Sequence, residues 1–170
     1  MADFKQEMTR AIPQLRRYAR ALVNQVDVAD DLVQDCLERA LAKKHQWDER
    51  RGMRPWLFAI LHSIYSNQTR RYKRTPAMVP YSGMEAASSA PDNIDLMLTD
   101  LQRALDMLPD DYRQVLLLVG LEQMSYKETS VVLNVPIGTV MSRLTRARKK
   151  LRLLMTDPTL PTVPQIRRVK

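Results

Sequence analysis

Cationic and small polar side chains share one face of a helix that the sequence predicts over about residues 137–149. The apolar positions of this segment recur at helical spacing and form a single stripe; they are Val140, Leu144, Ala147 and Leu151. The remaining side chains include Thr139, Met141, Ser142, Arg143, Thr145, Arg146 and Lys149. Such a face fits the DNA major groove, where Arg reads guanine and Ser or Thr can serve as donor or acceptor.

A shorter helix is predicted immediately before it. Ser125 and Glu128 have the spacing of a capping box, in which each satisfies a free N–H at the start of the helix. Pro136 ends this helix, because the residue before a proline is pushed out of the α region. Together the two segments predict a helix-turn-helix. The alternative is a solvated amphipathic helix in an ordinary bundle, since charge runs on helices are common.

Acidic and amide side chains gather on a second predicted helix, residues 27–46, with Asp27 as its N-cap. One face of this helix carries Asp31, Gln34, Asp35 and Glu38, with Asp30 beside them. The face predicts either a solvated surface, favourable near a helix N-terminus, or a docking patch for a basic partner. Composition alone favours the solvated surface.

A third predicted helix, residues 53–74, has Pro55 in its first turn and ends in a strongly basic segment, residues 67–74. Cations interleaved with aromatic rings suit single-stranded nucleic acid, because cations hold phosphates and rings stack on unpaired bases. The alternative is a helix end whose cations complement the macrodipole.

Composition narrows the class of protein. The 170 residues carry a formal charge of +8, which favours a polyanionic partner such as nucleic acid or an acidic membrane. Cys36 is the only cysteine, and His45 and His62 are the only histidines, so no disulfide framework and no Cys/His zinc set can form. We expect a cytoplasmic protein without cofactor, bound metal or catalytic site. Only four glycines occur, and strand-like alternation is lacking, so we expect an all-α fold.

The order of segments predicts two small helical domains. Residues 1–74 form the first, beginning with a helix over residues 3–24 that we expect to break near Ala11 or Ile12, just before Pro13. Residues 75–91 read as a flexible linker of prolines and serines. Residues 92–155 form the second domain, with Asp110 as an N-cap, and residues 156–170 form a Pro-rich basic tail.

Five stretches, in this order and spacing, resemble the group IV or extracytoplasmic-function (ECF) sigma factors of bacterial RNA polymerase. They are residues 30–35 (DDLVQD), 54–62 (RPWLFAILH), 108–113 (LPDDYR), 125–128 (SYKE) and 135–148 (VPIGTVMSRLTRAR). The resemblance covers nearly the whole chain except the linker and the tail.

The resemblance implies sigma region 2 at residues 1–74 and region 4 at residues 92–155. It implies that Asp30, Asp31, Gln34, Asp35 and Glu38 dock on the clamp helices of the largest polymerase subunit, with the flap of the second-largest subunit as a further contact. It implies that the −10 element is melted and bound by Trp56, Ser63, Asn67, Arg70, Arg71, Lys73 and Arg74. Duplex reading of the −35 element falls to Thr139, Met141, Ser142, Arg143, Thr145, Arg146 and Lys149.

The implied partners are core RNA polymerase, promoter DNA and an anti-sigma factor, as in a stress response, with no small-molecule substrate and no membrane insertion. Two positions depart from the family pattern. Ser63 stands where Asn is frequent, and serine lacks the amide's paired donor and acceptor, so Asn67 is expected to share base capture. Met141 stands where a cation is frequent. A mimic that sequesters an anti-sigma factor, and a stand-alone helix-turn-helix regulator, are the alternatives.

Overall fold

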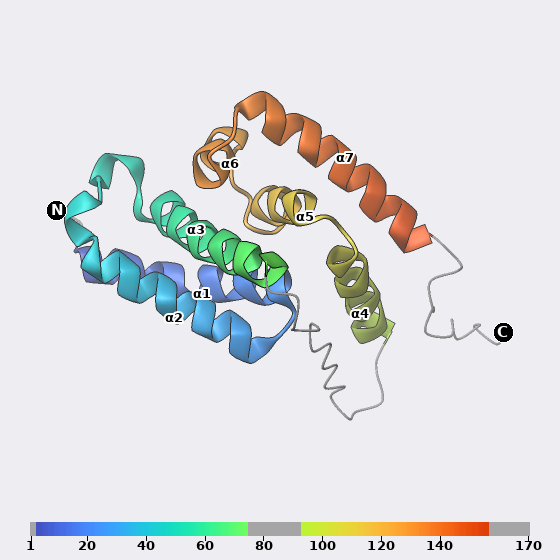
Figure 1. The fold of residues 1–170 in the computed structure, drawn as a ribbon, viewed down its shortest axis with the longest axis horizontal. Helices are drawn as coiled ribbons and strands as arrows, with labels where there is room; N and C mark the ends of the chain where they lie inside the picture. The colour runs from blue at the N-terminus through green and yellow to red at the C-terminus, as the bar shows by residue number, and fades with distance from the viewer. Residues whose placement is uncertain (1–2, 75–92, 157–170) are drawn as a thin grey trace.

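The computed structural model describes residues 3–74 and 93–156, and every regular element within them is helical. The N-terminal half consists of α1 (Phe4–Val23), α2 (Val26–Ala42) and α3 (Met53–Arg74), packed side by side as a bundle (Figure 1). Its core is apolar and close-packed, with the Tyr18 ring edge-on to Phe58 at 5.2 Å between centroids. This confirms the all-α expectation.

The predicted break in the first helix is wrong, because α1 runs without interruption through Pro13. The buried side chains Met8, Ala11 and Leu15 continue in register past the proline, while Pro13 itself is exposed. Burial of this stripe in the core outweighs the loss of one helical hydrogen bond. The proline therefore lies on the solvent side of a helix that tertiary packing keeps continuous.

Two predicted N-caps are also wrong by one or two residues. Helix α2 begins after Gln25, so Asp27 lies in its first turn, and Asp110 is the first residue of α5 after Pro109. Acidic side chains are favourable throughout the first turn of a helix, so composition predicts the region of the start but not the cap residue. The αL conformation of Asn24, with φ 51°, turns the chain early into α2.

Between α2 and α3 the chain makes two 3₁₀ turns, Lys44–Gln46 and Glu49–Arg51. Gly52 follows with a φ of 75°, a conformation that favours glycine, and leads directly into α3. Trp47 packs its ring edge-on against Phe4, with 5.4 Å between centroids. The turn is therefore fixed to the bundle by an aromatic contact.

The C-terminal half contains α4 (Asn93–Asp106), α5 (Asp110–Leu116), a π turn labelled η3 (Leu117–Leu121), α6 (Tyr126–Leu133) and α7 (Ile137–Thr156). The capping box at the start of α6 is confirmed: Glu128 accepts from the Ser125 N–H at 2.8 Å, and Ser125 Oγ accepts from the Glu128 N–H at 3.1 Å. The pKa of Glu128 is lowered by the hydrogen bond from the Ser125 N–H to its carboxylate and by a second one from the Ser125 hydroxyl to Oε2 at 2.8 Å. The αL conformation of Asn134 ends α6 and sets the turn into α7.

The two halves pack together. Figure 1 shows α3 between the α1–α2 pair and the α5–α6 pair, and one continuous cluster of buried apolar side chains extends from α1 to α7. The predicted linker, residues 75–91, and all but the first residue of the predicted tail lie outside the described residues.

Candidate functional site

The face of α7 that points away from the core carries the predicted duplex-reading side chains. Val140, Leu144 and Ala147 are buried. The exposed side chains on the opposite side, which we call the recognition face, are Met141, Ser142, Thr145, Arg146 and Lys149. Buried apolar positions thus orient the helix so that these five meet solvent.

Both hydroxyl groups on this face are bonded back to the helix. Ser142 Oγ donates to the Thr139 carbonyl at 3.1 Å, and Thr145 Oγ1 donates to the Met141 carbonyl at 3.0 Å. With the hydroxyl proton engaged, each oxygen presents its lone pairs outward. In this conformation the two residues act as acceptors between the cations of Arg146 and Lys149, and Thr139 is itself partly buried.

Arg143 differs from the rest of the predicted set. It is partly buried, and its Nη2 lies 3.2 Å from Asp111 Oδ2. It therefore points toward α5 of the same half rather than to the open side of α7, and its predicted role in duplex reading remains a prediction.

Arg143 lines a groove of about 590 Å³ between α3 and the helix-turn-helix, which we call the α3 groove. On the α3 side the groove is lined by Ser63, Asn67 and Arg70, three of the predicted −10 residues. The opposite wall is residues 131–135 of α6 and the following turn. The structure thus places the predicted strand-binding side of α3 against the C-terminal half.

His62 and Gln114 also line this groove, and His62 Nδ1 lies 2.6 Å from Gln114 Oε1. Burial lowers the pKa of His62, and the nearby cations Arg70 and Arg143 lower it further, whereas the hydrogen bond to Gln114 and the charge of Asp111 oppose them. The surroundings of His62 at the contact between the halves therefore favour the neutral imidazole over the charged one.

A second, smaller hollow of about 240 Å³ lies between the end of α2 and α3, and we call it the α2–α3 hollow. Ser63 and Trp56 line it together with three residues that sequence reasoning missed, Arg39, Lys43 and Gln46. Ser63 lines both hollows, whereas Asn67 lines only the α3 groove. No local pattern singles out the three missed residues, because they reach Ser63 only through the packing of α2 on α3.

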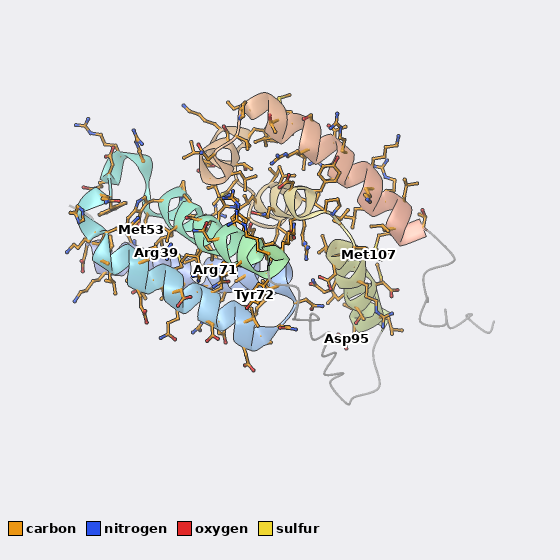
Figure 2. All side chains as sticks on the ribbon, in the orientation of Figure 1. Arg39, Met53, Arg71, Tyr72, Asp95 and Met107 are labelled. Carbon is orange, nitrogen blue, oxygen red and sulfur yellow. The ribbon has the colours of Figure 1, made fainter. Side chains whose placement is uncertain are left out.

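Figure 2 labels Arg71 and Tyr72 near the basic C-terminal end of α3. Arg70, Arg71, Lys73 and Arg74 are exposed, and Tyr72 is 66% exposed. Lys73 Nζ lies 3.7 Å from Asp110 Oδ2 in the C-terminal half. One of the predicted strand-binding cations is thus engaged between the halves.

On α2, Asp31, Gln34, Asp35 and Glu38 are exposed and form the α2 acidic face. Gln34 Nε2 donates to Glu38 Oε1 at 3.0 Å, which orders one end of this face. Asp30 stands apart from it, because its Oδ1 lies 3.5 Å from Arg20 Nη2 and 4.0 Å from Arg16 Nε on α1. The charge of Asp30 is therefore partly offset inside the bundle.

Sequence reasoning also missed a cluster of charges that joins the halves. Glu122, which follows the π turn, is 1% exposed. Its carboxylate accepts from Arg17 Nε at 3.0 Å and from Arg17 Nη2 at 2.9 Å, and Arg54 Nη2 lies 3.2 Å from Oε2 and also donates to the Glu122 carbonyl. The hydrogen bond and the charge of Glu122 raise the pKa of Arg17.

Cys36 is a free cysteine buried in the N-terminal half. Burial raises the pKa of the Cys36 thiol to about 12, and its Sγ donates to the Leu57 carbonyl. A buried thiol with a raised pKa is a poor nucleophile. Among residues 3–74 and 93–156 no three His, Cys, Asp or Glu side chains gather as a metal site. In the same two ranges no helix is both long and apolar enough to cross a bilayer.

The fold and these surfaces define a two-part helical protein with a helix-turn-helix and an exposed acidic face on α2. Family models agree: "Sigma2 domain of PhyR" matches residues 8–62, and "Sigma-70, region 4" matches residues 98–151. The ECF RNA polymerase sigma factor EcfG of Rhodopseudomonas palustris is 34% identical over 90% of this chain and 85% of its own length. The chain belongs to the ECF RNA polymerase sigma factors.

Two solved structures extend the similarity to three dimensions. The sigma factor RpoE of Bartonella quintana, in complex with the anti-sigma factor NepR, is 31% identical, has a TM-score of 0.76, and aligns over 91% of this chain and 98% of its own. CnrH, in complex with the cytosolic domain of CnrY, is 27% identical, with a TM-score of 0.66 over 89% and 86% of the two chains.

Proposed function

We propose that this sigma factor adds to core RNA polymerase, reads −35 and −10 promoter elements, supports melting of the promoter and takes no catalytic part itself. The proposal rests on three separate surfaces in one chain. They are the α2 acidic face, the polar side of α3, which carries Ser63, Asn67 and Arg70, and the recognition face of α7. A stand-alone helix-turn-helix regulator would need only the last of these.

In this proposal residues 1–74 act as region 2 and residues 92–155 as region 4, with residues 75–91 between them. The α2 acidic face docks on basic residues of the clamp helices in the largest polymerase subunit. Its three carboxylates, Asp31, Asp35 and Glu38, are exposed, which leaves their charge available to a basic surface. Region 4 additionally contacts the flap of the second-largest subunit.

The α2–α3 hollow is the proposed receptor for an extruded −10 base. A flipped base is held by stacking on an aromatic ring and by hydrogen bonds to its Watson–Crick edge. Trp56 supplies the ring, while Gln46 and Ser63 supply short polar groups in the same hollow. Arg39 and Lys43 add positive charge at its edge, and the basic end of α3 follows the strand backbone. Gln46 thus provides the amide that Ser63 lacks.

The −35 element is read by the recognition face, with Arg146 and Lys149 as its cations and Met141 as an apolar contact for a thymine methyl group. The exposed oxygens of Ser142 and Thr145 accept from base amines or from bridging water. Thr139 and Arg143, at the partly buried edge of the helix, join the duplex contact when the two halves separate.

An anti-sigma factor of the NepR kind is the proposed regulator. RpoE, which aligns over nearly the whole of this chain, was solved with NepR bound. The cytoplasmic location inferred from the sequence remains a prediction.

Reconstitution with core polymerase tests the proposal. The 5′ ends of transcripts made after overexpression identify a matched promoter, and purified protein plus core enzyme should then start transcription at that promoter. Core enzyme alone is the control. Tight binding to an anti-sigma factor without any transcription would instead indicate a mimic, and operator binding without core enzyme would indicate a stand-alone regulator.

A further inference from the structure

Glu122 belongs to the C-terminal half, yet both of its cationic partners belong to the N-terminal half. Its side chain has no exposed area, while Arg17 lies on α1 and Arg54 lies in the first turn of α3. Arg17 binds the carboxylate through two nitrogens, the geometry of strong charge-assisted pairs. A buried carboxylate loses its hydration, so it is stable only while those cations stay in place.

The backbone on both sides of Glu122 has unusual conformations that orient its carboxylate. The Glu122 N–H bonds to the Leu117 carbonyl in the π turn η3, and the next residue, Gln123, has a φ of 54°. A π turn and a non-glycine residue in the left-handed region are both unfavourable locally, and such features persist where the surrounding structure requires them. Here they place Glu122 between α1 and α3.

Other polar contacts close around the same junction. Tyr65 on α3 donates to Asp110 Oδ1 at 2.9 Å, and Arg113 on α5 donates to the Leu22 carbonyl of α1 at 3.1 Å. The Asn24 amide donates to Asp106 at 2.8 Å. Most of these partners are only partly buried, so water can replace them more readily than it can replace the contacts of Glu122.

This closed arrangement is incompatible with reading both promoter elements. Asn67 and Arg70, from the proposed strand-binding side of α3, share one groove with Arg143 of α7. By their positions, the −10 and −35 elements lie about 25 base pairs apart, or about 85 Å of duplex at about 3.4 Å per base pair. The two halves must separate before each can reach its own element.

We propose that Glu122, with Arg17 and Arg54, is a latch that holds region 4 on region 2 in a closed conformation without any partner protein. The latch keeps the C-terminal half against the α3 groove and so narrows access to it, and formation of the polymerase complex has to break the latch. The consequence for transcription rests on the proposed function, but the latch itself is a property of the isolated chain.

Energy transfer between two dyes on the full chain tests the latch. Gln6→Cys on α1 and Thr156→Cys at the end of α7 provide exposed attachment points, while the buried Cys36 stays unlabelled. Glu122→Gln keeps the shape of the side chain and removes its charge, so the open population should rise. Arg17→Gln with Arg54→Gln should raise it to a similar extent, and combining all three changes should add little, because they remove one shared interaction.

A second measurement separates opening from simple damage. The affinity of the full chain for a labelled oligonucleotide of about twelve thymidylates should increase in Glu122→Gln, because access to the α3 groove widens. A threefold larger open fraction gives about threefold tighter binding. Glu7→Gln is the matched control, since it makes the same change in net charge within the N-terminal half, where Glu7 pairs with Arg10.

Each outcome decides the question. Unchanged energy transfer in both the Glu122 and the double-arginine variants would overturn the latch. A fall in transfer with unchanged or weaker oligonucleotide binding would also overturn it, since the latch would not have narrowed access to the groove. A chain that opens and binds the strand but never supports transcription would leave the latch standing and refute the proposed function.

Discussion

The recognition face of α7 and the polar side of α3 both suit nucleic acid, but they differ in how closely the rest of the chain packs around them. The recognition face points into solvent, with Arg146 and Lys149 exposed. The polar side of α3 forms one wall of the α3 groove, opposite α6, and Lys73 at its end pairs with Asp110. One face is thus fully open in the closed conformation, and the other lies in a groove between the halves, where Ser63, Asn67 and Arg70 are still exposed to solvent.

The difference indicates an order of events. Duplex DNA is stable without the protein, so a duplex-reading face can remain exposed until a promoter arrives. A strand-binding face is useful only once the duplex has opened, and while exposed it would hold any unpaired strand through its cations. Placing the C-terminal half beside this side of α3 until the polymerase complex forms narrows access to it and therefore limits non-specific binding.

The largest effect is expected on the α2 acidic face, which resembles the recognition face in being exposed. Asp31→Arg with Asp35→Arg should reduce affinity for core polymerase by several kcal/mol, because like charges then face each other at the interface. Titration of labelled core enzyme measures the loss, and circular dichroism checks that helicity is unchanged. Near-native affinity of the double variant would show that this face is only solvated surface.

On the recognition face, Arg146→Ala should weaken duplex binding by about 1–3 kcal/mol if Arg146 reads a guanine edge. Affinities for −35 duplexes with single base-pair changes show whether the loss depends on sequence. A uniform loss, together with a salt slope smaller by about one, would assign Arg146 to phosphate instead. Arg152→Ala, an exposed cation further along α7, is the control and should change little.

On α3, Asn67→Ala should slow open-complex formation about tenfold, or about 1.4 kcal/mol, if Asn67 takes part in base capture. A pre-melted bubble promoter should largely restore transcription, and permanganate footprinting of unpaired thymines shows the opening directly. Gln46→Ala tests the proposed base receptor, the α2–α3 hollow, and should slow opening as well. A native opening rate for Asn67→Ala with a slow rate for Gln46→Ala would confine base capture to the hollow.

The smallest effect is expected from pH. In the closed conformation the pKa of His62 lies below its ordinary value of about 6.5, chiefly through burial, with Arg70 and Arg143 lowering it and Gln114 and Asp111 opposing them. The open conformation restores the ordinary pKa and so binds more protons. The closed form is therefore most favoured above about pH 6.5, and it weakens as pH falls from there through the lowered pKa.

Energy transfer between the same dye positions measures this, on lowering the solution from about pH 7.5 to about pH 5.5. The open population should rise in the native chain, and His62→Asn should remove most of the pH dependence. His45→Asn is the matched control, because His45 is the other histidine and is exposed. If His62→Asn kept the full response, the pH dependence would belong to other groups.

The sequence predicted more of the recognition face of α7 than of the polar side of α3. The helix-turn-helix follows from local signals: Ser125 and Glu128 cap α6, Asn134 ends it, and the apolar stripe orients α7. For α3 the sequence predicted the bounds and the basic end. It did not predict that Ser63 lines both hollows while Asn67 lines only the α3 groove, because that depends on which elements pack against each side of the helix.

The amino-acid sequence by itself determined the helices, the helix-turn-helix and the family, because caps and apolar periodicity act between residues a few positions apart. Only the tertiary structure decided that α1 continues through Pro13, that Arg39, Lys43 and Gln46 join Ser63, and that Glu122 lies between two arginines. Glu122 is 105 residues from Arg17 and 68 from Arg54 along the chain. Contacts at such separations arise only when the two halves pack, and no local pattern encodes them.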